Sequence, residues 1–244
     1  MARFPPRPAR YGRLATVLAT ALVVLGLPLI GNAEPAGFQP GIHFRALDPP
    51  VATRSGDHIE VLDFFAYSCR HCYIFEPILA QWALRLPDDV VLRRVPLTTG
   101  PGGDLHVRLF YTAEALGVID RLHTNIFEAV LRQGRPLQTR ADIRAFLVEH
   151  GVDGDDFDRV FDSPAIDKRI NAAFLISQGY GVRTTPTMGV DGHYFADPVP
   201  ARTYQRFLQV IDFLVQRGAT PAHSGCGSRS TSATRRPCST TDPA

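Results

Sequence analysis

The sequence has only four cysteines among 244 residues, and this excludes one class of fold. A secreted domain held together mainly by disulfides needs a denser cysteine framework in a chain of this length. Internal repeats are also absent, and the chain as a whole is not of low complexity. With 45% hydrophobic and 20% charged residues, the composition is instead typical of a globular protein with one sizeable core.

The chain lacks a strong excess of charge of either sign, because its formal net charge is only +2. Even this excess comes from the two ends. Residues 1–33 hold four arginines and no acid, and the segment from Arg217 onward holds four arginines and one aspartate. The body between them is mildly acidic. Because nucleic-acid binding needs a basic face, we expect no nucleic-acid partner.

Long apolar runs are absent too, except for one between residues 14 and 30. It follows a basic segment and is followed by Gly31-Asn32-Ala33, whose small residues suit a signal peptidase. The pattern predicts a signal peptide over residues 1–33, cleaved after Ala33, and export to the periplasm, where disulfides persist. An uncleaved membrane anchor is the alternative, although a glycine and a proline interrupt the end of the run.

Two segments of strand character flank a helical segment that begins with two cysteines. Residues 58–65 are mostly apolar and β-rich, as are residues 90–95, and a weaker strand is possible near residues 42–47. Residues 69–86 repeat apolar side chains at helical spacing, with Pro77 inside the helix. This order predicts a βαβ unit with parallel strands and a right-handed crossover.

A helical block separates this unit from a second β segment. Helices are expected over residues 105–116, 120–132, 141–150, 155–161 and 165–178, with Asp142 and Ser163 as caps and Gly117, Gly134 and Gly151 at helix ends. Asp191-Gly192 predicts a hairpin turn, and residues 199–216 a last amphipathic helix.

The predicted fold is therefore α/β, a thioredoxin-like fold with an inserted helical domain. We expect residues 34–101 to form its first part, 102–179 the insertion, 180–217 its second part, and 218–244 a disordered tail.

The chemistry is predicted to lie in Cys69-Arg70-His71-Cys72. Cys69 should begin a helix, where unpaired amides and the helix dipole lower a thiol pKa, and the cations of Arg70 and His71 should stabilise its thiolate further. Cys72, one turn later, is better shielded and suits the resolving role. A stabilised thiolate means a stabilised reduced form, so we expect an oxidising disulfide that is donated through a mixed disulfide at Cys69.

A zinc half-site and an inert structural disulfide are the alternatives for this CxxC pair. A zinc site would need a second ligand pair, and the remaining cysteines, Cys226 and Cys238, lie in the expected tail. We therefore expect neither a metal nor another cofactor.

Thr185-Pro186 is the second candidate element, because it directly precedes a predicted strand. A cis proline there would leave backbone groups of Thr185 able to pair with an extended substrate chain. An ordinary trans proline at a strand start is the alternative.

Over about residues 42–216 the sequence resembles the DsbA family of bacterial periplasmic disulfide oxidoreductases. The matching segments are Val61-Leu62-Asp63-Phe64-Phe65, Cys69-Arg70-His71-Cys72-Tyr73, Phe75-Glu76, Gly102-Gly103-Asp104-Leu105, and Gly181-Val182-Arg183 ahead of Thr185-Pro186. The resemblance implies that Cys69 is the nucleophile, Cys72 the resolving thiol and His71 the thiolate stabiliser, with a cis Pro186 facing the disulfide and Thr185 beside it. It also implies a monomer that oxidises reduced exported proteins and is reoxidised by a DsbB-like, quinone-linked membrane partner. Tyr73 is a candidate for the surface that contacts substrates.

The sequence departs from the family pattern at three points. Arg70 stands where well-known members carry proline. Asp63 and Arg94 occupy the positions expected for a buried Glu and Lys beneath the active site, either as a proton relay to Cys72 or as an ion pair between strands. The tail lies outside the resemblance.

Other functions remain open on the residues alone. One is a disulfide isomerase or reductase on the same fold, although residues 34–50 leave little chain for a dimerisation region. Another is a metal-binding CxxC module, and a third is a glutathione-dependent isomerase on a related fold.

Overall fold

The computed structural model of the protein describes residues 37–99 and 103–218. The expected signal peptide and the tail with Cys226 and Cys238 lie outside these residues. In the described ranges, every helix is too short or too polar to cross a membrane.

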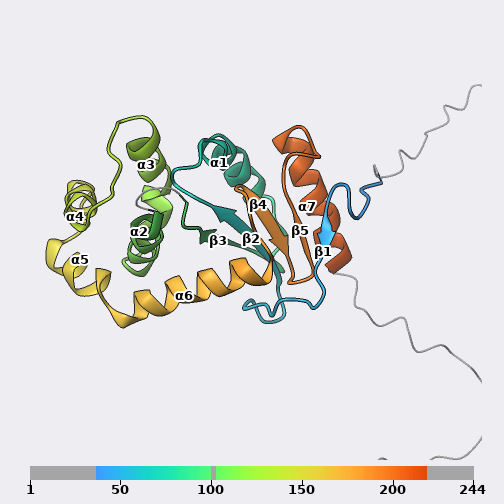
Figure 1. Ribbon diagram of the computed structural model, residues 1–244, viewed down its shortest axis with the longest axis horizontal. Helices are drawn as coiled ribbons and strands as arrows, with labels where there is room; N and C mark the ends of the chain where they lie inside the picture. Colours follow the sequence, from blue (N-terminus) through green and yellow to red (C-terminus); the bar gives the residue numbers. More distant parts are fainter. Residues whose placement is uncertain (1–36, 100–102, 219–244) are drawn as a thin grey trace, which may run out of the picture. The chain divides into compact units, whose positions relative to one another are not determined.

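A five-stranded sheet forms the centre of the fold, with strand order β1-β5-β4-β2-β3 (Figure 1). Its strands are β1 (Arg45–Ala46), β2 (Ile59–Phe65), β3 (Val90–Pro96), β4 (Thr187–Val190) and β5 (Tyr194–Ala196). The predicted parallel pairing of β2 with β3 is confirmed, as is the antiparallel hairpin of β4 and β5. β2 is buried along its whole length, which explains its nearly continuous apolar sequence.

Two helices pack together beside the sheet. They are α1 (Arg70–Ala83), which connects β2 to β3, and α7 (Tyr204–Gly218) at the end of the described chain. Their shared core contains Val61 of β2, Phe75 and Leu79 of α1, and Phe207 and Ile211 of α7. α1 is thereby held with its first residue at the carboxyl end of β2.

The remaining helices form the block that the sequence predicts between β3 and β4. They are α2 (Gly103–Ala115), α3 (Ile119–Leu131), α4 (Arg140–Glu149), α5 (Gly154–Phe161) and α6 (Pro164–Gly179). Figure 1 shows α6 as the long helix that leads from this block back to the sheet. A second apolar core joins the block to β2 through Leu62 and Phe64, and α3 also contacts α1.

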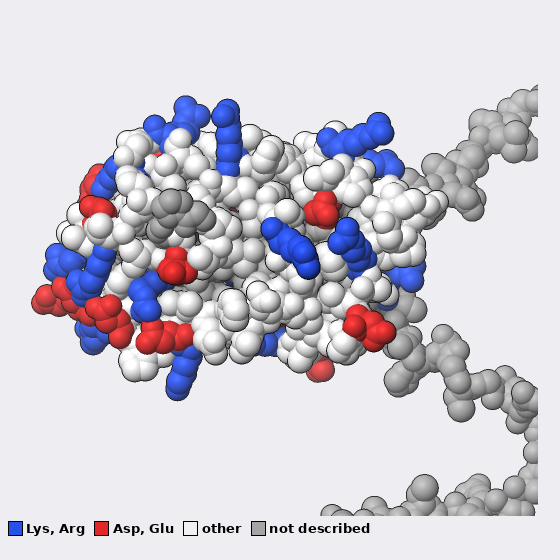
Figure 2. Space-filling view, viewed as in Figure 1, with Lys and Arg blue, Asp and Glu red and all other residues white. Residues whose placement is uncertain are grey.

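The ends of the block's helices correct one sequence prediction. Thr139, not Asp142, is the N-cap of α4, and its hydroxyl accepts a hydrogen bond from the Asp142 amide at 3.1 Å. Ser163 is the N-cap residue of α6, but its side chain makes no capping hydrogen bond, and Pro164 occupies the first helical position, where the missing N–H costs nothing. Figure 2 shows acidic and basic side chains interspersed over α4 and α5, where Arg140 and Arg144 both pair with Asp158.

Candidate active site

Cys69 is the N-cap residue of α1, as the sequence predicts. Its sulfur accepts a hydrogen bond from the backbone amide of Cys72 at 3.1 Å, so the thiol itself caps the helix. Both cysteines are free thiols in the structure; Cys69 is half-buried and Cys72 is 3% exposed. Only the first sulfur is therefore open to an incoming protein thiol.

The two thiols of the pair have opposite acidities. A hydrogen bond from the Cys72 thiol, the side chain of Thr185 and the amides of Cys72 and His71 lower the pKa of Cys69 to about 6, against an opposing effect of burial. Burial raises the pKa of Cys72, and its contacts with Cys69 raise it further. At neutral pH Cys69 is thus mainly a thiolate and Cys72 a thiol.

Thr185 and Pro186 face this pair from the loop before β4. The Thr185–Pro186 peptide bond is cis, and Pro186 is buried. The Cys69 sulfur lies 3.4 Å from the carbonyl oxygen of Thr185, to which it can donate a hydrogen bond only in its protonated form. The loop therefore places backbone polar groups directly beside the reactive sulfur.

The imidazole of His71 is hydrogen bonded to Tyr204 at the start of α7. The Tyr204 hydroxyl lies 3.2 Å from His71 Nδ1 and also 3.2 Å from the His71 carbonyl oxygen. If the single hydroxyl proton is donated to the carbonyl, Nδ1 must carry the proton of the other hydrogen bond. Tyr204 is itself packed on Phe75, with ring centroids 5.0 Å apart.

Beneath the cysteines lies a buried carboxyl group, Asp63 of β2. It is 2% exposed, and its Oδ1 has no hydrogen-bond partner among the described residues. Burial raises the pKa of Asp63 to about 8, the negative charge of Glu76 adds to the shift, and the positive charge of Arg94 opposes it. Asp63 is therefore largely protonated at neutral pH.

An ion pair between Asp63 and Arg94 is one of the two roles expected from the sequence, and in the structure Arg94 pairs with a different carboxylate. The two residues are neighbours in the β2–β3 register, but Arg94 Nη2 lies 2.5 Å from Oε1 of Glu76 on α1. Glu76, which we expect from its sequence to be solvated, is only 8% exposed. Burial alone would raise the pKa of Glu76, but its contacts with His123 and Arg94 lower it, so Glu76 stays charged.

His123 of α3 extends this buried group toward the helical block. Its Nε2 lies 3.4 Å from Oε2 of Glu76, and its Nδ1 shares a hydrogen bond of 2.8 Å with the Tyr67 hydroxyl. Burial lowers the pKa of His123 and favours the neutral ring. We call Asp63, Tyr67, Glu76, Arg94 and His123 the buried polar cluster.

Comparison with known proteins decides the family. A family model described as "DSBA-like thioredoxin domain" matches residues 102–209. Over 205 residues the chain is 36% identical to the "Thiol:disulfide interchange protein DsbA" of Azotobacter vinelandii, which covers 84% of this chain and 95% of that protein. This chain belongs to the DsbA family.

Solved DsbA structures agree with that assignment. The crystal structure of Pseudomonas aeruginosa DsbA is 32% identical, with a TM-score of 0.73, and the match covers 76% of this chain and 96% of that one. DsbA of Xylella fastidiosa is 30% identical, with a TM-score of 0.69 and coverage of 75% and 98%. The predicted thioredoxin-like fold and the predicted enzyme class, a protein disulfide oxidoreductase, are confirmed.

Two residues near the site of this DsbA-family chain were not identified from its sequence. His123 has no ligand-like spacing, but it shares the buried face of α3 with Ile126 and Phe127, so a helical projection places it inward. Tyr204 lies within the amphipathic helix predicted over residues 199–216, and no local pattern indicates that it holds His71. Arg70 is exposed and makes no hydrogen bond or ion pair within the described ranges.

A metal centre finds no support at this site. In the part of the chain that the structure describes, no three His, Cys, Asp or Glu side chains come together in a way that could hold a metal ion.

Proposed function

We propose that the protein donates a Cys69–Cys72 disulfide to reduced exported proteins in the periplasm. A thiolate of the substrate attacks the Cys69 sulfur, the Cys69–Cys72 bond breaks, and Cys72 leaves and takes up a proton. A second substrate thiolate then attacks the substrate sulfur of this mixed disulfide and releases Cys69 as a thiolate. Two substrate thiols become one disulfide, and the enzyme's disulfide becomes two reduced cysteines.

The single observation that carries this proposal is the opposite acidity of the two sulfurs. A Cys69 pKa of about 6 makes Cys69 a good leaving group and stabilises the reduced enzyme, so donation of the disulfide is downhill. The raised pKa of Cys72 keeps it protonated between reactions and confines exchange with substrates to Cys69.

The neighbouring residues take supporting roles in this scheme. Backbone groups of Thr185 and the Pro186 loop bind the extended substrate chain, and His71 stabilises the Cys69 thiolate through its backbone amide. Asp63 supplies the proton that Cys72 takes up when the disulfide opens, because its pKa of about 8 keeps it protonated at neutral pH. Arg94 forms an ion pair with Glu76 and so keeps the Glu76 carboxylate charged beneath the site.

Turnover requires reoxidation, for which we propose a DsbB-like, quinone-linked membrane partner that accepts the two electrons. The enzyme is proposed to work as a monomer after removal of residues 1–33.

Absorbance of the reduced protein near the thiolate band, followed against pH, tests the central claim. We expect a midpoint near pH 6 that disappears in Cys69→Ser and persists in Cys72→Ser. A midpoint near the ordinary thiol value of about 8.5 would remove the driving force for donation. Incubation with fully reduced and with scrambled ribonuclease separates the activities: an oxidase acts on the first, whereas an isomerase restores activity to the second.

A further inference from the structure

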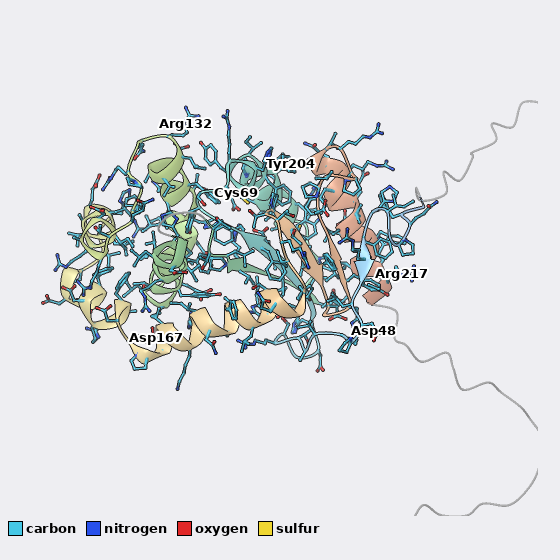
Figure 3. All side chains as sticks on the ribbon, in the orientation of Figure 1. Asp48, Cys69, Arg132, Asp167, Tyr204 and Arg217 are labelled. Carbon is cyan, nitrogen blue, oxygen red and sulfur yellow. The ribbon has the colours of Figure 1, made fainter. Side chains whose placement is uncertain are left out.

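A groove opens beside the reactive sulfur, between the first turn of α1 and the end of α3. It has a volume of about 460 Å³ and is lined by Arg70, Tyr73, Ile74, Leu131 and Arg132. We call it the α1–α3 groove. Because Arg70 follows Cys69 directly in the chain, the groove begins one residue from the sulfur that forms the mixed disulfide. Figure 3 shows Cys69 between the end of α3, where Arg132 lies, and Tyr204 at the start of α7.

The charge of the groove is positive. Arg70 has no partner within the described residues. Arg132 is paired only loosely, since its Nε lies 3.8 Å from Glu128 Oε2 and its side chain is 65% exposed. Glu128 is also engaged by Tyr73, whose hydroxyl donates to Oε1 at 2.5 Å. Two guanidinium groups therefore line the groove, and Glu128, which pairs with Arg132, is already engaged by Tyr73.

The rest of the groove is apolar and held in place. Ile74 is 45% exposed and contributes an aliphatic surface to the groove. Tyr73 is fixed by its hydrogen bond to Glu128 and by Phe127, with ring centroids 6.0 Å apart. The groove thus offers a fixed aromatic and aliphatic surface between two exposed cations, which suits a short side chain with a charged end.

We propose that the α1–α3 groove binds an acidic side chain of the substrate, within about three residues of the reacting cysteine. This inference rests on the proposed disulfide donation and names the class of substrate it favours: reduced proteins with Asp or Glu close to a cysteine. An extended chain advances about 3.3 Å per residue, so such a side chain reaches the groove while its cysteine is bonded to Cys69. Guanidinium groups can bind the carboxylate through paired hydrogen bonds.

The reaction itself changes the charge beside the groove. Cys69 is neutral in the disulfide and in the mixed disulfide, and becomes a thiolate when the product leaves. A carboxylate in the groove is therefore attracted by the oxidised enzyme and is held less well by the reduced one, because like charges repel. Acidic flanking residues should favour both the binding of the substrate and the release of the product.

Reduced peptides with one cysteine test the proposal. They carry Asp, Asn or Leu at one of the three positions on either side of the cysteine and are otherwise identical. The initial rate of reduction of the oxidised protein is measured for each peptide after acid quenching. It is divided by the rate of the same peptide with hydroxyethyl disulfide, which carries no charge, so that differences in the peptides' own thiol reactivity are removed.

For the parent protein we expect the Asp peptide to be faster than the Asn peptide by about threefold at the best position, as for exposed charge pairs, and by less in high salt. Arg132→Gln should lower this ratio, and Arg70→Gln with Arg132→Gln should bring it close to one. Arg85→Gln is the matched control. It removes one exposed guanidinium beyond the other end of α1, roughly 20 Å along a helix of 14 residues, and should leave the ratio unchanged.

Three results would overturn the groove's assignment while leaving disulfide donation intact. They are a ratio near one in the parent protein, a ratio that both arginine substitutions leave unchanged, and a Leu peptide that is the fastest. If the oxidised protein reacted with none of the peptides faster than hydroxyethyl disulfide does, the proposed function itself would be refuted.

Discussion

The tip of α1 and the buried polar cluster beneath it adjust acidity in different ways. At the tip, Cys69 is half-buried and its pKa falls because a neighbouring thiol and backbone amides donate hydrogen bonds to it. In the cluster, Asp63 is fully enclosed and its pKa rises mainly because burial removes water from the carboxylate. Hydrogen-bond donors therefore lower the pKa of Cys69, whereas loss of water around the carboxylate raises the pKa of Asp63.

The different causes of the two pKa shifts imply that the two regions depend on the rest of the fold to different extents. The tip needs only a helix that starts at Cys69 and the loop of Thr185, so it should tolerate changes deeper in the protein. The cluster draws on β2, β3, α1 and α3 together, so a single substitution should be felt as a change in stability. Substitutions in each region test whether the two are separable in this way.

The largest effect is expected for Asp63→Asn at alkaline pH. The folded state keeps a proton on Asp63 up to about pH 8, whereas the unfolded chain releases it near pH 4, so stability falls as pH rises between these values. The slope is about 1.4 kcal/mol per pH unit, and the variant should be more stable than the parent by roughly 5 kcal/mol at pH 8 and similar at pH 4. Urea unfolding of the oxidised protein measures both.

Asp88→Asn, a change at an exposed aspartate, is the control for this series. It should leave the fall in stability between pH 4 and pH 8 as it is in the parent. If Asp63→Asn also retained that fall, Asp63 would be ionised in the fold and the contrast with Cys69 would be lost.

A second test removes the cation of the cluster. Arg94→Leu leaves the charge of Glu76 buried without its 2.5 Å partner, and we expect a loss of about 3 kcal/mol in the free energy of unfolding at pH 7. Combining it with Glu76→Gln should recover part of that loss, since the uncompensated charge is then gone. A double variant no more stable than Arg94→Leu would show that the pair's charge is not what destabilises the single variant.

A third test addresses the tip alone by comparing reduced and oxidised protein. The Cys69 pKa of about 6 lies below its unfolded value, so the thiolate's contribution is present above about pH 8.5 and is lost as pH falls through 6. The stability of the reduced form relative to the oxidised form should thus rise between pH 6 and pH 8.5, by about 2 kcal/mol after allowance for solvent screening of this half-exposed group. Asp63 is present in both forms, so the part of its opposite slope that does not depend on Cys69 cancels, whereas the negative charge of Cys69 in the reduced form adds to the rise in the Asp63 pKa.

Reduced Cys69→Ala protein provides the control, because it should lack the rise between pH 6 and pH 8.5 that reduced parent protein shows. A difference between reduced and oxidised protein that does not change with pH would mean that the Cys69 thiolate is not stabilised by the fold.

The local parts of this architecture could be predicted from sequence because their signals are local. The helix start at Cys69 follows from a CxxC pair at the end of an apolar strand, and Asp191-Gly192 indicates a tight turn, in which both residues have positive φ angles of 50° and 68°. Each of these features is determined by residues within one or two turns of one another.

The cluster could not be predicted, because its partners come from four separate elements. Asp63 and Arg94 are paired in the strand register, so an ion pair between them is a reasonable expectation. Glu76, however, lies on the same buried face of α1 as Cys72 and Leu79, and a charged residue on that face gives no sequence sign of the guanidinium that neutralises it. Only the packing of α1 against β3 and α3 brings Arg94 and His123 to the same carboxylate.

The smallest expected change in stability gives the clearest test of whether the buried polar cluster and the tip of α1 act independently. Tyr67→Phe removes the hydroxyl that shares a 2.8 Å hydrogen bond with His123, and leaves a buried ring nitrogen without its partner, at a cost of about 1 kcal/mol in unfolding free energy. Tyr194→Phe is the control, since its hydroxyl has no hydrogen bond within the described residues. The Cys69 midpoint should stay near pH 6 in both variants. A shift in Tyr67→Phe alone would mean that the cluster helps to set the acidity of Cys69, and that the two regions act as one.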